Sequence, residues 1–328
     1  MLPDVTLPVP ASLMNVLAAF APLFTVPSFR TFCGLACGFL AQAGKRTVCG
    51  MLAGAGLARL WPHDRAHRFF SGARWNPDEL GLAAAKLVVA LLVPAGEPVT
   101  VAIDDTLFKR RGKKVWAASW FHDGSAPGPA KTGYGNNWVV AAVVVKLPAL
   151  RRPVAIPVLA KLVIKDTSSA SRLWLARRMA AAIAGALPGR RIHVTADSAY
   201  AGGELKKLPD RVTWTTRLRK DAALYELPPA RTGRRGRPRV KGARLPSLPS
   251  LAATARFGPV TVHRYGKTAT VQAAAITCLW QRGLRRPRRP GRAGPRPREG
   301  RIRPRAGHHR SGRNASPGDR AVCGPLVY

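Results

Sequence analysis

The sequence predicts an α/β (α+β) protein in which a helical N-terminal domain precedes a mixed sheet and a disordered, Arg-rich tail. Apolar residues recur at helical spacing up to about residue 95, and from Val99 the period changes to that of strands. After Trp280 the composition shifts abruptly to Arg, Gly and Pro. With 328 residues, 46% of them hydrophobic, the chain is long enough for about two domains with their own cores.

The first domain is predicted to span residues 1–95 and to bind DNA. Its apolar residues fall at helical spacing in four stretches separated by Pro or Gly, namely 11–24, 30–42, 46–60 and 77–92. Asn76-Pro77 followed by two acids is typical of a helix start, because acids are favourable near the positive end of a helix. Two interpretations of its basic residues stay open: contacts to a DNA end, or solvated charges on a packing domain.

The second domain is predicted to span residues 96–280 and to begin with a strand that ends in Asp104. The expected strands are 99–103, 115–121, 138–146, 191–196 and 212–218, with a further extended run over 154–164, a helix over 171–187 and a short helix over 203–208. Three strands, a helix and then strand-helix-strand is the order of an RNase H-like core. In that fold the strands that end in Asp104 and Asp197 lie side by side.

Asp104 and Asp197 are the candidate catalytic residues and metal ligands. Carboxylate oxygens hold hard cations such as Mg²⁺, and two such ions clamp the attacking and leaving oxygens of a phosphodiester. An Asp at a strand end is often only a turn or a helix cap, and for either residue alone that interpretation is the stronger one. The pair, in a chain of net charge +38, favours metal-dependent chemistry on DNA.

The charge, the cysteines and the hydropathy restrict the partners and the compartment. Fifty-four Lys and Arg against 16 Asp and Glu indicate a polyanionic partner. The five cysteines show no spacing typical of a zinc site or a disulfide framework, which fits a reducing cytosol. The apolar stretch 11–26 is interrupted by Pro22 and is too short to span a bilayer. We therefore expect a cytoplasmic, nucleoid-associated protein with no membrane partner and no small-molecule cofactor.

A basic loop and a hairpin follow the predicted core. The segment 227–250 is rich in Pro, Arg and Gly and contains Arg234, Arg235 and Arg237. Arg-Gly-Arg-Pro is the core of hooks that enter a narrow minor groove, although a solvated or phosphate-tracking loop is the stronger interpretation. Alternating residues over 254–264 and 268–280 predict a β-hairpin.

The tail, residues 281–328, has an unusual composition: 14 Arg and no Lys. Arg without Lys, beside Gly, Pro and Ala, is what GC-rich DNA gives when it is read out of frame. A back-translation of Arg320–Tyr328, shifted by one nucleotide, gives Tyr-Ala-Val-Arg and restores ordinary protein sequence. The hypothesis is a frameshift after about residue 280, and the alternative is a true Arg-rich arm that binds nucleic acid.

The chain resembles the insertion-sequence transposases of the DDE superfamily, in the branch with a Tyr-x₂-Arg-x₃-Glu helix and a β-rich insertion. The resemblance covers roughly residues 25–280. It rests on Ile103-Asp104-Asp105-Thr106, Tyr134-Gly135-Asn136-Asn137-Trp138, Thr195-Ala196-Asp197-Ser198-Ala199-Tyr200 and Thr216-Arg217-Leu218-Arg219.

The resemblance implies roles for these acids. In the family the first metal ligand is an Asp followed by any residue and then Thr or Ser, which selects Asp104 and leaves Asp105 as second choice. The second ligand maps to Asp197, the insertion maps to about 225–279, and an intact member uses two Mg²⁺ or Mn²⁺ ions. The implied partners are double-stranded DNA, as transposon ends and target, and a second copy of the chain in a possible homodimer on DNA.

The third acid of the family has no counterpart here, because no acid after Asp197 sits in a Tyr-x₂-Arg-x₃-Glu setting. The expected function is therefore that of a DNA transposase, an endonuclease and strand transferase, whose activity is impaired in this copy. The alternatives are a non-catalytic basic DNA-binding protein derived from a transposase and, less favoured, a basic RNA-binding protein in which the Asp pair is structural.

Further residues are candidates for contacts with DNA. Arg217, Arg219 and Lys220 follow the strand after Asp197 and are expected to contact phosphates near the scissile bond. Trp214 and Tyr200 could stack on an unpaired base, although a role in the core is the stronger interpretation for both.

Overall fold

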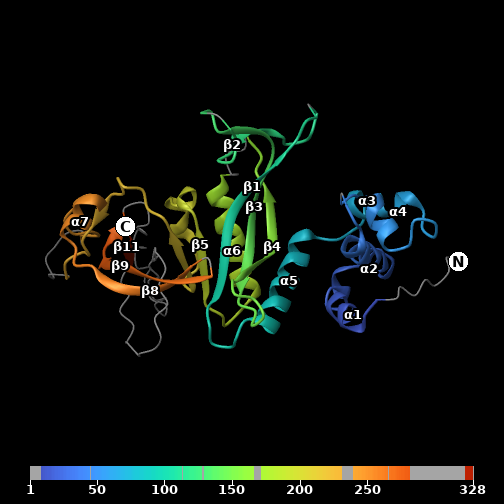
Figure 1. Cartoon of the computed structure of the whole chain (residues 1–328), viewed down its shortest axis with the longest axis horizontal. Coiled ribbons are helices and arrows are strands. Elements are labelled where there is room, and N and C mark those ends of the chain that lie inside the picture. Colours follow the sequence, from blue (N-terminus) through green and yellow to red (C-terminus); the bar gives the residue numbers. More distant parts are fainter. Residues whose placement is uncertain are drawn as a thin grey trace, which may run out of the picture. The chain divides into compact units, whose positions relative to one another are not determined.

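The computed structural model describes residues 9–44, 46–112, 114–127, 129–165, 171–230, 239–264, 266–280 and 322–327. The chain divides into two compact units, Met1–Leu87 and Val88–Tyr328. The first unit is helical, and the second contains the sheets and the helix α6 (Figure 1). No helix in the described part of the chain is long and apolar enough to cross a membrane.

Two of the N-terminal helices begin at a threonine whose side chain satisfies a free amide group. Thr25 accepts a hydrogen bond from the Ser28 N–H, and Thr47 accepts one from the Gly50 N–H, as is typical of helix N-caps. The helices are α1 (Ala11–Ala18), the 3₁₀ turn η1 (Ala21–Leu23), α2 (Val26–Ala41), α3 (Val48–Gly54), α4 (His63–Ser71) and α5 (Pro77–Leu92).

Two of the predicted N-terminal helices were too long, and one helix was missed. The stretch 11–24 divides at Phe20, ahead of the proline in η1. The stretch 46–60 ends after Gly54, because Gly56 adopts a left-handed backbone with φ of +68° that stops the helix. The missed helix, α4, then begins directly after Pro62.

The core of the first unit is formed by side chains from α2, α3 and α4 and the segment between the last two. Its buried members are Leu35, Leu52, Leu57, Trp61, Ala66 and Phe69. The close packing of α2 on α3 depends on Gly38, because a Cβ there would lie 1.7 Å from the Met51 carbonyl oxygen. Arg65 lies over the Trp61 ring, 3.9 Å from its centroid, and its Nε donates to the Thr31 hydroxyl.

The main sheet of the second unit has the strand order β2-β3-β1-β5-β6, and β4 pairs with β3. Strand β1 is antiparallel to β3 and parallel to β5, and β5 is parallel to β6. This mixed sheet confirms the predicted α/β class and the pairing of the first strand with the strand that ends before Asp197. The strands are β1 (Val99–Lys109), β2 (Ser119–His122), β3 (Thr132–Val145), β4 (Val154–Leu162), β5 (Ile192–Ala196) and β6 (Val212–Thr216).

Helix α6 (Arg172–Ala186) packs on this sheet, as Figure 1 shows. Ser171 caps its first turn by accepting a hydrogen bond from the Trp174 N–H. Leu175, Met179 and Ile183 are buried at helical spacing and form the core face of the helix, which confirms the predicted helix over 171–187. The 3₁₀ turns η2 (Ser198–Tyr200) and η3 (Gly203–Lys207) then join β5 to β6.

The segment predicted as a β-rich insertion contributes strands to two small sheets. Strand β10 pairs with β7, and a three-stranded sheet has the order β11-β9-β8. The predicted hairpin is confirmed as β8 and β9. The elements are β7 (Leu224–Tyr225), α7 (Leu248–Thr254), β8 (Gly258–Arg264), β9 (Lys267–Thr277), β10 (Leu279–Trp280) and β11 (Val322–Val327).

Two segments of this region differ from the sequence prediction. The end of the predicted loop 227–250 starts a helix, α7, because Ser247 caps it and Pro249 suits its first turn. Within the predicted disordered tail, residues 322–327 pair with β9 as strand β11. The rest of the tail lies outside the described residues.

The turn between β2 and β3 is held by Asp123, and it gives a prediction for acid stability. Hydrogen bonds from Ser125 and from Lys109, whose Nζ lies 2.9 Å from Oδ2, hold the pKa of the Asp123 carboxyl at about 2. Because this pKa is lowered on folding, the stabilisation is complete above the ordinary Asp pKa near 4 and is lost as the pH falls toward about 2.

Asp123→Asn should therefore flatten the dependence of the melting temperature on pH in this acidic range. The exposed Asp221→Asn is a matched control that should keep the original slope. An Asp123→Asn variant with the same acid sensitivity as the parent chain would contradict this account.

Candidate active site

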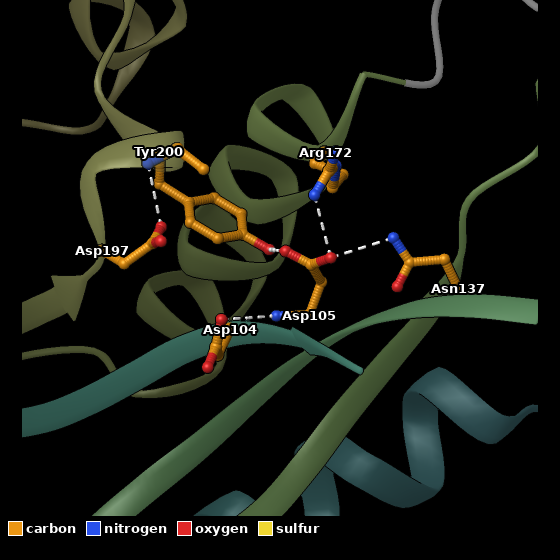
Figure 2. Close-up of polar contacts among 7 residues, drawn as sticks. Asp104, Asp105, Asn137, Arg172, Asp197 and Tyr200 are labelled. Atoms are coloured by element: carbon orange, nitrogen blue, oxygen red, sulfur yellow. Dashed lines mark hydrogen bonds and ion pairs between the residues drawn. The ribbon is translucent and has the colours of Figure 1, made fainter. Parts of the chain in front are cut away.

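The paired strands β1 and β5 bring Asp104 and Asp197 to neighbouring positions. Ile103 pairs with Ala196 in parallel register, so the next residues, Asp104 and Asp197, lie side by side. The predicted strand end at Asp104 is wrong, because β1 continues along β3 to Lys109, and Asp104 pairs with Val140 in the middle of the strand. Asp197 directly follows β5 and caps η2 by accepting a hydrogen bond from the Ala199 N–H at 2.9 Å (Figure 2). Both Asp residues are exposed.

The Asp104 carboxyl lies in an acidic environment. Its Oδ1 accepts a hydrogen bond of 2.8 Å from the Asp105 backbone N–H. Although Asp104 is exposed as a residue, partial desolvation by the surrounding protein raises the pKa of its carboxyl. That hydrogen bond lowers the pKa, whereas the negative charges of Asp105 and Asp197 raise it further. Such mutual repulsion is relieved when a cation binds between the carboxylates.

Asp105 turns away from this pair and is occupied by three protein donors. Its Oδ1 accepts from the Tyr200 hydroxyl at 3.1 Å, and its Oδ2 accepts from Asn137 Nδ2 and Arg172 Nη1, each at 2.9 Å. The side chain is 16% exposed. Figure 2 shows these donors gathered around Asp105 alone. The Asp104 carboxyl accepts a hydrogen bond from a backbone amide. Because Asp105 is occupied by protein donors, Asp104 is the better candidate for a metal ligand, as the resemblance implied.

The two aromatic candidates for base stacking, Tyr200 and Trp214, lie in the core. Both side chains are fully buried, with 0% exposure. Burial and then the charge of Asp105 raise the pKa of the Tyr200 hydroxyl far above its ordinary value, so Tyr200 acts as a hydrogen-bond donor. The core interpretation of both residues is confirmed, and neither presents a face to a DNA base.

The cationic residues after β6 lie close to the acidic pair in the sheet. Thr216 pairs with Ala196 in parallel register and its hydroxyl donates to the Asp197 carbonyl. The next residue, Arg217, is exposed, as are Arg219 and Lys220. These three residues stay candidates for phosphate contacts. The other three predicted contacts, Arg234, Arg235 and Arg237, lie outside the described residues.

Glu204 is the acid nearest in sequence after Asp197, and it is engaged elsewhere. Its Oε1 lies 2.7 Å from Lys207 Nζ, and its Oε2 lies 3.0 Å from Arg177 Nε. The hydrogen bond from Lys207, followed by the charges of both bases, lowers the pKa of Glu204. Using Glu204 as a third metal ligand would require both ion pairs to break.

Sequence reasoning missed the network around Asp105. Asn137 lies in one of the motifs that carry the resemblance, so the sequence indicated that it matters but did not indicate its role. Arg172 had no signal, because a basic residue at a helix start is ordinary and its contact with Asp105 depends on how α6 packs. Tyr200 was considered for stacking rather than for its hydroxyl.

Comparison with protein families gives a match over most of the chain. The family model described as DDE superfamily endonuclease matches residues 19–287. The chain belongs to the DDE superfamily of endonucleases. No curated protein matches it. Among solved structures, the cryo-EM structure of the piggyBac transposase synaptic complex with hairpin DNA is similar at 11% identity, with a TM-score of 0.33. That match covers 60% of this chain and 42% of the piggyBac transposase chain.

DDE superfamily endonucleases generally use divalent metal ions. The residues of this DDE endonuclease fit such an ion on the chemistry of the donors. Asp104 and Asp197 offer exposed carboxylates at neighbouring positions of β1 and β5, and oxygen donors of this kind suit Mg²⁺ and Mn²⁺.

Proposed function

We propose that this DDE endonuclease is the transposase of an insertion sequence that acts on the ends of double-stranded DNA. The observation that carries the proposal is the juxtaposition of Asp104, in the middle of β1, and Asp197, directly after the parallel neighbour strand β5. Membership of the superfamily and the net charge of +38 support DNA as the substrate.

Each residue of the site has a task in this proposal. Asp104 and Asp197 would hold Mg²⁺ or Mn²⁺, as two ions in an intact family member, and the ions would supply Lewis acidity and lower the pKa of bound water. Asp105, through Arg172 and Tyr200, fixes the middle of β1 so that Asp104 keeps its position. Arg217, Arg219 and Lys220 bind the phosphates that flank the cut.

We also propose that this copy binds DNA but cuts it poorly. The sequence after Asp197 contains no acid in a Tyr-x₂-Arg-x₃-Glu setting, and Glu204 is committed to two ion pairs. This observation favours the second candidate function, a non-catalytic DNA-binding protein derived from a transposase.

One experiment separates the two candidate functions. The full chain is tested for binding and for Mn²⁺-dependent nicking of duplex DNA that carries the ends of its own element. We expect binding that falls steeply with salt, at a log–log slope of about −0.9 per phosphate contact, and nicking near background. Efficient nicking by the chain as it stands would show that a different acid completes the site, and absence of salt-dependent binding would refute the DNA-binding function.

Arg217 gives a direct test of the DNA surface. Arg217→Ala should reduce the magnitude of the salt slope by about 0.9 and weaken binding similarly for all sequences, because phosphate contacts carry no base information. Arg151→Ala is the matched control. Arg151 is exposed and follows the end of β3 that pairs with the start of β1, away from Asp104. Equal slopes for the two variants, measured by fluorescence anisotropy, would exclude Arg217 from the interface.

A further inference from the structure

The first unit brings together three metal-binding side chains at its surface: Cys49, His63 and His67. Cys49 lies in the first turn of α3, whereas His63 begins α4 and His67 follows one turn later. The Cys49 Sγ is 3.1 Å from His63 Nε2 and 3.9 Å from His67 Nε2. The ligand atoms of the three residues all lie within 4.8 Å of one another, and all three residues are exposed.

This arrangement has the geometry of a zinc centre. Zinc binds thiolate sulfur at about 2.3 Å and imidazole nitrogen at about 2.0–2.1 Å, so ligand atoms of a tetrahedral site are roughly 3.5 Å apart. The two sulfur–nitrogen distances, 3.1 and 3.9 Å, lie on either side of that value. Histidines four positions apart share one face of a helix, which directs both rings toward Cys49.

The donor types select the metal. A thiolate with two imidazoles suits zinc, whereas Mg²⁺ and Mn²⁺ prefer the oxygen donors found at Asp104 and Asp197. The expectation that no cysteine and histidine in this chain are spaced for zinc was therefore incomplete. That expectation rested on short motifs. Cys49 is 14 positions from His63 and 18 positions from His67, and the three residues meet only because α3 packs on α4.

We propose that Cys49, His63 and His67 bind Zn²⁺, with water in the fourth position, and that the ion ties α3 to α4. The helices that it joins also supply Leu52 and Phe69 to the core of the unit. Zinc binding therefore stabilises the folded unit by mass action. The inference does not depend on the proposed transposase function, because all three ligands lie in the first unit.

The test is a metal titration of the full chain after treatment with a chelator. Co²⁺ serves as the spectroscopic probe, since a thiolate ligand gives a charge-transfer band and tetrahedral geometry gives intense visible bands, and Zn²⁺ is then added to displace it. We expect one Co²⁺ per chain, displaced by Zn²⁺, and a higher melting temperature with zinc. Cys49→Ser should remove the charge-transfer band, and His67→Gln should weaken zinc binding at least tenfold.

Two controls exclude binding elsewhere. The first control, Cys37→Ser, changes a partly exposed thiol of α2 that lies outside the cluster. The second control, a His308→Ala/His309→Ala double variant, removes two consecutive histidines of the sequence. Both controls should bind zinc like the parent chain. Unchanged zinc affinity in Cys49→Ser and His67→Gln, loss of binding in either control, or no binding by the parent chain would each overturn the proposal. The last result would leave a thiol–imidazole hydrogen bond as the whole interaction.

Discussion

Asp104→Asn and Asp197→Asn should each weaken Mn²⁺ binding in the second unit by about 10²-fold or more, without loss of stability. Each substitution removes one of the two carboxylates assigned to the ion, and supporting residues alone are worth about 10–100-fold in metal sites. The fold should be as stable or slightly more stable, because the negative charges of Asp105 and Asp197 already raise the pKa of Asp104.

Electron paramagnetic resonance of Mn²⁺ and a denaturant melt measure the two effects on the same samples. Glu97→Gln is the matched control, since Glu97 is exposed and lies just before the start of β1, away from Asp104 in the middle of the strand. If Glu97→Gln and Asp104→Asn weaken Mn²⁺ binding equally, the ion is held by general surface charge rather than by the carboxylates of Asp104 and Asp197.

Under the frameshift hypothesis, the same substitutions can also be tested by activity. A chain extended by a Tyr-x₂-Arg-x₃-Glu helix in the shifted frame should nick and join DNA, and Asp104→Asn or Asp197→Asn in that chain should return the activity to background. An extended chain that stays inactive while still binding Mn²⁺ and DNA would argue against the frameshift hypothesis.

Asp105→Ala, in contrast to Asp104→Asn, should lower the stability of the second unit, by about 2 kcal/mol. It removes three hydrogen bonds at once and leaves Arg172 without its carboxylate. Breaking a fully buried ion pair costs about 3–5 kcal/mol. We expect a smaller cost for Asp105→Ala because the Arg172 side chain is 35% exposed.

Tyr200→Phe provides the graded comparison, because it removes only one of the three donors. Its expected cost is about 1.5 kcal/mol, the low end of the range for one hydrogen bond to a charged group. Chemical denaturation of the three variants should therefore rank Asp104→Asn, Tyr200→Phe and Asp105→Ala in order of increasing destabilisation. Equal stabilities for Asp104→Asn and Asp105→Ala would contradict the division of roles between these neighbouring acids.

The parts of the fold that were predictable are those set by local patterns. Alternating or continuous apolar runs identified β1, β5 and β6, and the spacing of Leu175, Met179 and Ile183 identified α6. The order of the strands was enough to predict that β1 pairs with β5, which places Asp104 beside Asp197. The length of β1 was not predicted, because its continuation to Lys109 depends on pairing with β3. That this pair is catalytic stays a prediction.

The features that were missed depend on packing between elements. Helix α4 is short and mostly polar, with Ala66 and Phe69 as its buried residues, so it lacks the apolar run that identified the other helices. The ligand cluster at Cys49 and the donors around Asp105 come from segments far apart in the chain. Their meeting is decided by how α3 lies on α4 and α6 on the sheet, which local periodicity does not specify.

The pairing of β1 with β5 has a consequence for biosynthesis. The partner strand of β1 is synthesised roughly 90 residues later, which at about 5–20 residues per second is several seconds after β1 itself. Until β5 arrives, β1 has β3 on one side and an open row of backbone donors and acceptors on the other. The nascent chain therefore exposes an aggregation-prone edge for that interval, and the acidic site comes into existence only when β5 closes it.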